Sequence, residues 1–213
     1  MMTVFFFGLT SCDKNEDITD AKAKFTVKEK TADKPVATKA SIGTFTFTKA
    51  VIGISKVDFE VEANTNDDEL EFEYEGSYSF DILTGTSTPP LPYVEIEPGT
   101  YHELEVKVDR TLPSGSSLEI SGTYTIAGMS YDFEFTSTLD EDYEIENNIG
   151  VQVDPNSTVT FTLYIDLPNL FNGVDFALAQ LGPNNIIQIN ANSNSNFAEL
   201  IENNFNNALD FDD

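Results

Sequence analysis

Cysteine, histidine and tryptophan are almost missing from this chain. Its 213 residues include one cysteine, Cys12, one histidine, His102, and no tryptophan. A single cysteine excludes an internal disulfide, so the fold has to be stabilised by packing. One histidine and one cysteine cannot supply the several ligands of a zinc site. Without tryptophan, an aromatic platform for sugars would need exposed tyrosine or phenylalanine rings.

The single histidine also limits catalytic chemistry. A Ser-His-Asp triad would need His102, yet the sequence has no Gly-x-Ser-x-Gly nucleophile motif. Pairs of carboxylates could serve glycoside hydrolysis, but among 37 acidic residues some pair always looks suitable. We therefore expect no enzyme and no catalytic residue. His102 begins an alternating strand, where a position at the surface or rim is ordinary.

Basic residues are scarce after the first quarter of the chain. Residues 1–56 have nine lysines against six acids, a net charge of +3. Residues 57–213 have two basic residues against 31 acids, a net charge of −29. A surface this acidic repels phosphate backbones, so nucleic acid is not an expected partner. Cations and basic surfaces are attracted instead.

The only cysteine follows a short hydrophobic stretch. Leu9-Thr10-Ser11-Cys12 is succeeded at once by acidic and polar residues. The pattern resembles the lipobox of bacterial lipoproteins, which implies a lipid on Cys12 and a membrane anchor, to which each buried methylene adds about 0.8 kcal/mol. No basic residue precedes Cys12, although a secretory signal begins with some. Two interpretations stay open: the true N-terminus lies upstream of Met1, or the hydrophobic start is fortuitous.

Most of the remaining chain has a hydrophobic period of two. No later run approaches the roughly 18 apolar residues of a membrane helix. Alternation and turn residues predict strands at 24–30, 44–48, 57–62, 69–75, 78–83, 93–97, 104–108, 117–126, 131–135, 143–146, 150–154, 159–165 and 185–190. Many short strands separated by Pro, Gly and Asn turns favour an all-β protein. We expect an antiparallel β-sandwich of Greek-key, prealbumin-like or immunoglobulin-like type.

One amphipathic helix is predicted near the C-terminus, over about 196–209. Asn196 is expected to cap it, with Glu199 three residues on, and its apolar stripe should cover an end or edge of the sandwich. A short helical turn is expected near 169–172. The predicted organisation is a lipoprotein signal over 1–11, a tether over 12–22 and one domain over 23–213.

The acidic strands pose a folding problem. Strands 57–62 and 69–75 should pair, which sets glutamates against glutamates on the solvent side and is destabilising. Segment 24–30 has lysines on one face, with Phe25 and Val27 on the other. We predict that it is a strand beside an acid-faced strand, with cross-strand ion pairs of roughly 0.2–1 kcal/mol each. The alternative is a flexible, lysine-rich arm.

Calcium is the one cofactor that the acids suggest. Carboxylates at i and i+2 on a strand start about 7 Å apart and chelate poorly, whereas loops can converge their oxygens. The candidate metal ligands are Asn64, Asn66, Asp67 and Asp68 in one loop and Asp140, Glu141 and Asp142 in another. Neither loop has the glycine-containing spacing of a dedicated calcium loop, so solvated acids are the alternative.

Two tyrosines depart from the inward placement of the other aromatic residues. Tyr101 and Tyr164 are therefore the candidate ligand-binding residues of an exposed surface.

Several landmarks together resemble a known family. They are Val51-Ile52-Gly53-Ile54 before the strand 57–61, Phe80-Asp81-Ile82-Leu83-Thr84-Gly85, and the turn Glu97-Pro98-Gly99-Thr100-Tyr101. With the lipobox, they resemble an uncharacterised domain family of Bacteroidota surface lipoproteins with a prealbumin-like or carbohydrate-binding-like sandwich, over roughly residues 22–165. The resemblance transfers no catalytic residue. It implies a surface-exposed, lipid-anchored protein of the cell outer membrane and suggests glycan binding.

The resulting functional hypothesis is a non-catalytic binding or accessory module for a glycan or an envelope protein. The alternative is a structural or adhesion subunit that resembles fimbrillins and polymerises through donated strands. A polymer subunit should leave an open groove once its N-terminal segment is removed. A binding module should keep residues 22–30 in place.

Overall fold

The structure is a computed structural model that describes residues 20–30, 43–61 and 70–212. Its strands are β1 (Ala21–Glu29), β2 (Gly43–Val61), β3 (Leu70–Asp81), β4 (Thr86–Thr88), β5 (Val94–Ile96), β6 (Gly99–Val108), β7 (Leu118–Ile126), β8 (Met129–Ser137), β9 (Glu141–Val153), β10 (Thr158–Ile165), β11 (Ile187–Ile189) and β12 (Leu209–Asp212). The helices are α1 (Leu167–Leu170) and α2 (Ser195–Asn204), and 3₁₀ turns occur at Phe176–Leu178, Pro183–Asn185 and Asn206–Ala208. Helices long and apolar enough to cross a membrane were not found within these ranges.

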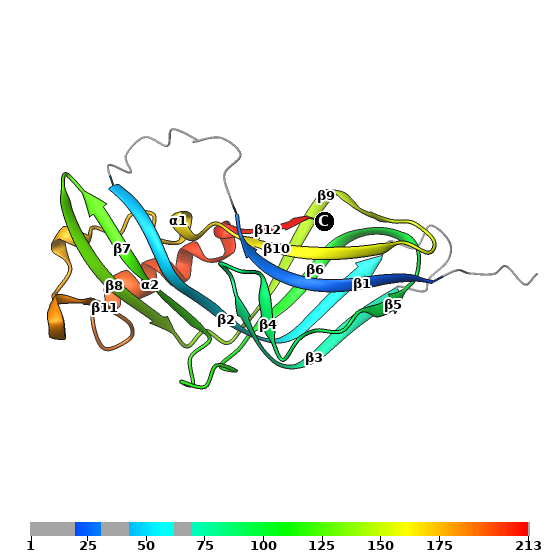
Figure 1. The fold of residues 1–213 in the computed structure, drawn as a ribbon, viewed down its shortest axis with the longest axis horizontal. Coiled ribbons are helices and arrows are strands. Elements are labelled where there is room, and N and C mark those ends of the chain that lie inside the picture. Colours follow the sequence, from blue (N-terminus) through cyan, green and yellow to red (C-terminus); the bar gives the residue numbers. More distant parts are fainter. Residues whose placement is uncertain (1–19, 31–42, 62–69, 213) are drawn as a thin grey trace, which may run out of the picture.

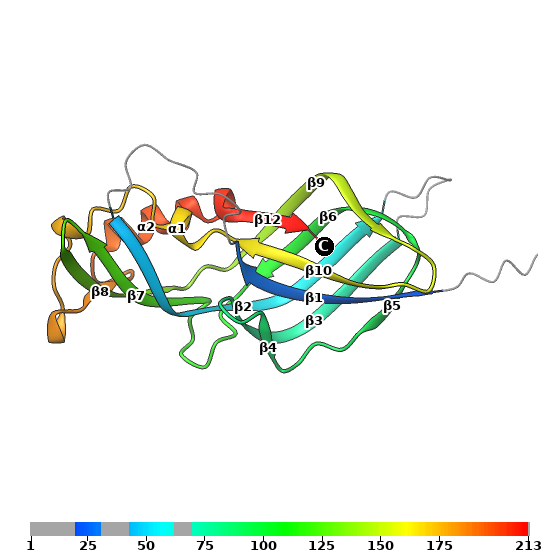
Figure 2. The same ribbon diagram turned by 45° about the horizontal axis from the view of Figure 1, so that its top comes forward.

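Two β-sheets form the sandwich that the alternation predicted. The smaller sheet has the order β12-β10-β1-β5, and the larger has the order β11-β8-β7-β2-β3-β4, with β6 pairing both β2 and β9. At one end of the molecule, the smaller sheet lies over β2, β3, β6 and β9, whereas β7, β8, β11 and α2 occupy the other end (Figures 1 and 2). The all-β fold class is confirmed.

The long strand β2 connects the two ends. Residues 43–52 pair with β7, and residues 54–61 pair with β6. Both partners are antiparallel to β2, so β6 and β7 run in the same direction. At the junction, the Gly53 amide donates to the Ser117 carbonyl and the Asp109 amide donates to the Gly53 carbonyl, so β6 and β7 follow one line with a loop between them. A Cβ on Gly53 would lie 2.6 Å from the Asp109 carbonyl oxygen, so the close approach requires glycine.

Two strand pairs depart from the antiparallel pairing of the other strands in the sandwich. β1 pairs with β10 in parallel, and β11 pairs with β8 in parallel, so both sheets are mixed. Parallel neighbours need a long connection, and each of these pairs joins strands that are far apart in the chain. A two-residue period shows which side of a strand is buried, but it is the same whether the neighbouring strand is parallel or antiparallel.

Phenylalanine rings fill the space between the sheets. Phe25 of β1 meets Phe80 of β3 with ring centroids 5.4 Å apart, and Phe59 of β2 meets Phe161 of β10 at 4.5 Å. All four side chains are buried. At the other end, Phe171 packs on the β2 and β8 rings, 5.0 Å from Phe133. Such aromatic pairs stabilise the fold by more than the burial of their apolar surface alone.

The lysine-rich N-terminal segment is a strand, as predicted, and it begins at Ala21, two residues before the expected start of the domain. The predicted acid-faced neighbour is wrong along β10: Lys24 lies opposite Thr160 and Lys28 opposite Tyr164. Among the described residues, Lys30 of this segment forms an ion pair: its Nζ lies 2.6 Å from Asp210 on β12. The burial of Phe25 and Val27, rather than charge pairing, holds β1 in place.

The C-terminal helix is shorter than expected. α2 ends at Asn204, and Leu209, expected in the helix, begins the edge strand β12. The helix begins at Ser195, so the predicted Asn196 cap is wrong and Asn194 is the residue before the first turn. The Asn194 side chain instead donates to the carbonyls of Gln180 and Gln188. The helical turn expected near 169–172 is present as α1.

Candidate functional site

The outward side of β3, β2, β6 and β9 carries charged residues. Ten of them have side chains that the structure describes, and we call these ten the acid face. Across these strands its rows are Glu75, Lys56, Lys107 and Asp142; Glu73, Asp58, Glu105 and Glu144; and, on β6 and β9, Glu103 and Glu146. The inward neighbours, such as Val57, Leu104 and Ile145, are buried in the core. The alternation therefore drives the carboxylates of all four strands to one side.

Acids directly face acids, as predicted. Asp58 lies opposite Glu73 on one side and opposite Glu105 on the other. Like charges in this position repel, so the face costs stability. Two lysines, Lys56 and Lys107, reduce this cost, rather than the N-terminal lysines.

Asp58 is the unusual member of the acid face. It is 3 % exposed, although its neighbours on the same face reach solvent. Its Oδ2 forms an ion pair with Lys56, whereas its Oδ1 is buried and has no hydrogen-bond partner. A buried carboxylate oxygen without a hydrogen-bond partner costs free energy, so the Oδ1 of Asp58 destabilises the folded state.

Titration of the exposed groups reflects the crowding. A side-chain hydrogen bond with Glu75 raises the pKa of Glu73, with smaller contributions from burial and from the charges of Glu75 and Asp58. The hydrogen bond to Asp58 raises the pKa of Lys56, and nearby acids add to this effect. The face therefore holds Lys56 firmly charged, and Glu73 takes up a proton more readily than an isolated glutamate.

The described candidate calcium loop is organised around a lysine. The Nζ of Lys107 lies 3.5 Å from Asp140 and 3.3 Å from Asp142. Glu141 turns elsewhere and accepts a hydrogen bond from the Tyr143 hydroxyl at 3.1 Å. The three candidate ligands are adjacent in the sequence, but the Lys107 ammonium group already lies between Asp140 and Asp142.

Metal cages are not preformed in the part of the chain that the structure describes. Within those ranges, no three His, Cys, Asp or Glu side chains converge as a metal site. The other candidate loop, with Asn64, Asn66, Asp67 and Asp68, lies outside the described residues, as does the candidate lipidation site Cys12.

The two candidate tyrosines behave differently. Tyr101 is 2 % exposed, so the expected exposed ring is wrong. Its ring packs 5.2 Å from Phe161, and its hydroxyl donates to the Glu97 carbonyl, because the turn before β6 folds back over it. Burial raises the pKa of Tyr101 to about 12. Tyr164 is half-buried on β10.

His102 makes a backbone contact. Its Nδ1 lies 3.1 Å from the Asn147 carbonyl oxygen, next to the bulge where β9 departs from β6. The Asn147 side chain accepts hydrogen bonds from the Ile149 and Gly150 amides, which shapes this bulge. The half-buried imidazole therefore lies at a strand irregularity at the rim of the sheet.

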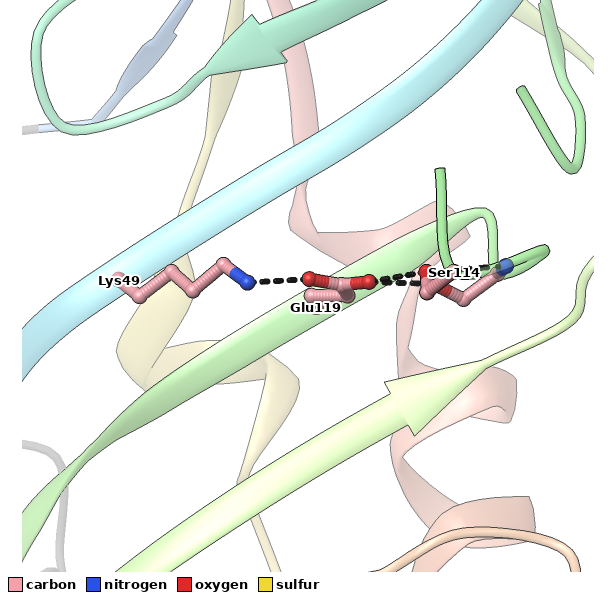
Figure 3. A network of polar contacts seen from close by, with 4 residues as sticks. Lys49, Ser114 and Glu119 are labelled. Carbon is pink, nitrogen blue, oxygen red and sulfur yellow. Dashed lines mark hydrogen bonds and ion pairs between the residues drawn. The ribbon is translucent and has the colours of Figure 1, made fainter. Parts of the chain in front are cut away.

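A second polar cluster lies at the loop between β6 and β7 and was not recognised in the sequence. Glu119 of β7 accepts hydrogen bonds from Ser114 and Ser116 on one oxygen and pairs with Lys49 of β2 on the other (Figure 3). Burial raises the pKa of this carboxyl, but the three donors and the Lys49 charge outweigh burial and lower the pKa to about 2. Every partner is a donor to a carboxylate, so the cluster anchors the loop. The Ser114-x-Ser116 spacing before Glu119 was the available signal.

Comparison with known proteins identifies a family. The model of the family described as Domain of unknown function (DUF4382) matches residues 26–178, which include β2 to β10 and the C-terminal end of β1. Searches of curated proteins and of solved structures found no match. Because the matched region covers more than half of the sequence, the chain belongs to the DUF4382 family.

Proposed function

We propose that this protein is a non-catalytic binding module, anchored by a lipid on Cys12 at the outer membrane of a Bacteroidota cell, that binds a basic surface of another envelope protein. The observation that carries the proposal is the acid face. Exposed carboxylates such as Glu75, Asp142 and Glu144 project from one side of four adjacent strands. Such a surface steers and selects basic partners, and its binding weakens with salt.

A protein ligand is favoured over a glycan by the aromatic residues. Sugar platforms need exposed rings, and among the described residues the large exposed side chains include one aromatic ring, Tyr93, at 54 %. Tyr101 is buried in the core. A row of exposed carboxylates matches a basic protein surface more closely than it matches a neutral sugar.

The absence of a catalytic role is supported by the contacts of the polar groups. His102 contacts a backbone carbonyl, and the hydroxyls of Ser114 and Ser116 donate to Glu119. A serine nucleophile needs a base that accepts its proton. The carboxylate that these serines face, Glu119, is already paired with Lys49, which makes it a weak base.

The fimbrillin-like alternative depends on the fate of β1. This strand lies between β10 and β5, and its Phe25 and Val27 are fully buried. A binding module keeps the strand, whereas a polymer subunit would lose it and open a groove in the smaller sheet. The tight packing of β1 in the intact chain supports the module.

The experiment is site-specific photocrosslinking in the cells that make the protein. A photoreactive residue at Glu144 or Glu75 should give one discrete adduct with an envelope protein, identified by mass spectrometry. The same residue at Asp132, an exposed acid on β8 away from the acid face, is the matched control. Equal adducts at Asp132, or none at Glu144 and Glu75, would reject the proposal. A glycan array that gives strong binding would replace the protein ligand by a sugar.

A further inference from the structure

We infer that residues 147–150, which we call the β9 bulge, present Ile149 as the apolar contact that holds the basic protein partner of the acid face. This role rests on the proposed function and deepens it, because it adds a second kind of contact to the charged one. The expected partner surface is an apolar pocket that is surrounded by lysine or arginine side chains.

The β9 bulge interrupts the pairing between β6 and β9. Four residues of β9 lie between Glu146 and Val151, whereas the matching positions of β6 have only His102 between them. A bulge re-aims side chains and is frequent next to functional sites. Of the large hydrophobic side chains whose exposure the structure describes, that of Ile149 is the most exposed, at 89 %. The extra residues therefore place one apolar side chain in solvent.

Hydrogen bonds of Asn147 fix the conformation of the β9 bulge. Its Oδ1 accepts from the amides of Ile149 at 3.0 Å and Gly150 at 3.1 Å. Its Nδ2 donates to the Phe211 carbonyl of β12 at 3.0 Å, and its own carbonyl oxygen lies 3.1 Å from the Nδ1 of His102. One residue therefore connects the bulge to β6 and to the smaller sheet.

The bulge closes at Gly150, in a conformation that favours glycine. The φ of Gly150 is +77°, and a Cβ there would lie 2.5 Å from the Thr100 side chain and 2.6 Å from the His102 ring. Single exposed hydrophobic residues are ordinary on protein surfaces. Ile149 differs because its backbone is held by these contacts, and a segment that is already ordered loses less entropy when it binds a partner.

Ile149 lies close to the acid face. Glu146, an exposed member of that face, precedes it by three residues, so their Cα atoms are at most about 11 Å apart. A standard protein interface buries about 800 Å² on each partner, which is enough to cover both residues. In such an interface the carboxylates guide a basic partner to the surface, and burial of the apolar side chain slows its dissociation.

The acids also decide which partner can cover Ile149. Two copies of this chain that met through the bulge would bring acid face against acid face, and like charges repel. A neutral apolar surface would gain from Ile149 but would bury exposed carboxylates such as Glu144 without a partner. A pocket with basic residues around it satisfies both requirements.

The test extends the photocrosslinking experiment to position 149 of the full chain in the cells that make it. A photoreactive residue there should give an adduct with the same envelope protein as at Glu144. In a chain with the photoreactive residue at Glu144, Ile149→Ala should reduce the adduct by about tenfold, since burying an isoleucine side chain strengthens binding by about 10- to 100-fold. Ile149 is exposed, so this variant should fold normally.

Leu178→Ala is the matched control and should leave the Glu144 adduct unchanged. The Leu178 side chain is 76 % exposed, in the 3₁₀ turn whose Phe176 packs on Tyr124 of β7 at the other end of the molecule. Asn147→Ala keeps the isoleucine but removes the bonds that hold the bulge. It should also reduce the adduct in a chain that is folded by circular dichroism.

The possible results separate this inference from the proposed function. Adducts at Glu144 with none at position 149, or a full Glu144 adduct in Ile149→Ala or in folded Asn147→Ala, would overturn the inference and leave the function. An equal loss in Leu178→Ala would also overturn the inference. An adduct at position 149 with none at Glu144 and Glu75 would keep the apolar contact and reject the acid face. Adducts at none of the three positions would reject both.

Discussion

Two carboxylates on the outer surfaces of the sheets differ in how their oxygens are satisfied. Glu119 has three donors, from Lys49, Ser114 and Ser116, whereas Asp58 has one partner for two oxygens. A fully satisfied carboxylate stabilises the folded state, and a half-satisfied one costs free energy. Glu119 is therefore expected to stabilise the fold, whereas the unpartnered oxygen of Asp58 costs stability.

Glu119 should make stability depend on acid pH. Its pKa is about 2 in the folded protein against an ordinary value of 4.5. A lowered pKa contributes stability above pH 4.5, and this contribution is lost as the pH falls towards 2. Glu119→Gln should therefore lower the free energy of unfolding by about 1–3 kcal/mol at pH 7, and the difference from the wild type should shrink at pH 3.

Urea unfolding at pH 7, 4.5 and 3 measures this effect. Glu134→Gln, at an exposed position on β8, is the control and should change stability by less than about 0.5 kcal/mol. A Glu119→Gln difference that stays constant with pH, or that is absent at pH 7, would contradict the proposed role of the carboxylate.

The strand β1 shows what an alternating pattern predicts for an element and what it leaves open. The alternation predicts that Phe25 and Val27 lie on the face opposite the lysines, and both are buried in the core. Along β10 the predicted acid-faced neighbour is wrong, because this pairing depends on contacts between distant parts of the chain that no local period records. On the other side, β5 sets Glu95 opposite Lys22. The predicted C-terminal end of the helix is wrong for a related reason. Leu209 and Phe211 are apolar and suit either the end of a helix or a strand, and pairing with β10 makes them part of the strand β12.

Removing the Phe25 side chain should destabilise the whole sandwich. The ring is fully buried and meets Phe59 of β2 at 6.1 Å and Phe80 of β3 at 5.4 Å. Phe25→Ala should cost about 3–5 kcal/mol, because it removes apolar contacts and leaves a cavity between the sheets. Chemical unfolding followed by circular dichroism measures this loss, with the exposed Lys22→Ala on the same strand as control. A loss below about 1 kcal/mol would mean that β1 is not part of the cooperative core.

At the scale of the molecule, the acid face is the outer surface of one part of the larger sheet, formed by β3, β2, β6 and β9. The sequence showed that glutamates occupy the wet side of several strands, and the repulsion between two of these strands was predicted correctly. The position of Asp58 between Glu73 and Glu105 was not predictable, because it requires the register of three strands. Both predicted chelation sites are therefore in loops, whereas the described carboxylates that face one another directly lie on neighbouring strands.

The last prediction concerns the attachment of the whole molecule. The first described strand, β1, begins at Ala21 at one end of the long axis, and the β7–β8 hairpin lies at the other end (Figure 1). A lipid on Cys12 would hold the protein by the β1 end and leave the opposite end farthest from the bilayer. If Cys12 carries the proposed lipid, Cys12→Ser should move the protein from the membrane fraction to the soluble fraction and abolish incorporation of a labelled fatty acid, since the acyl chains would supply the anchor. Lys14→Gln, two residues on, is the control and should leave both readouts unchanged. A Cys12→Ser protein that stays in the membrane fraction, or a wild-type protein that takes up no label, would exclude the anchor.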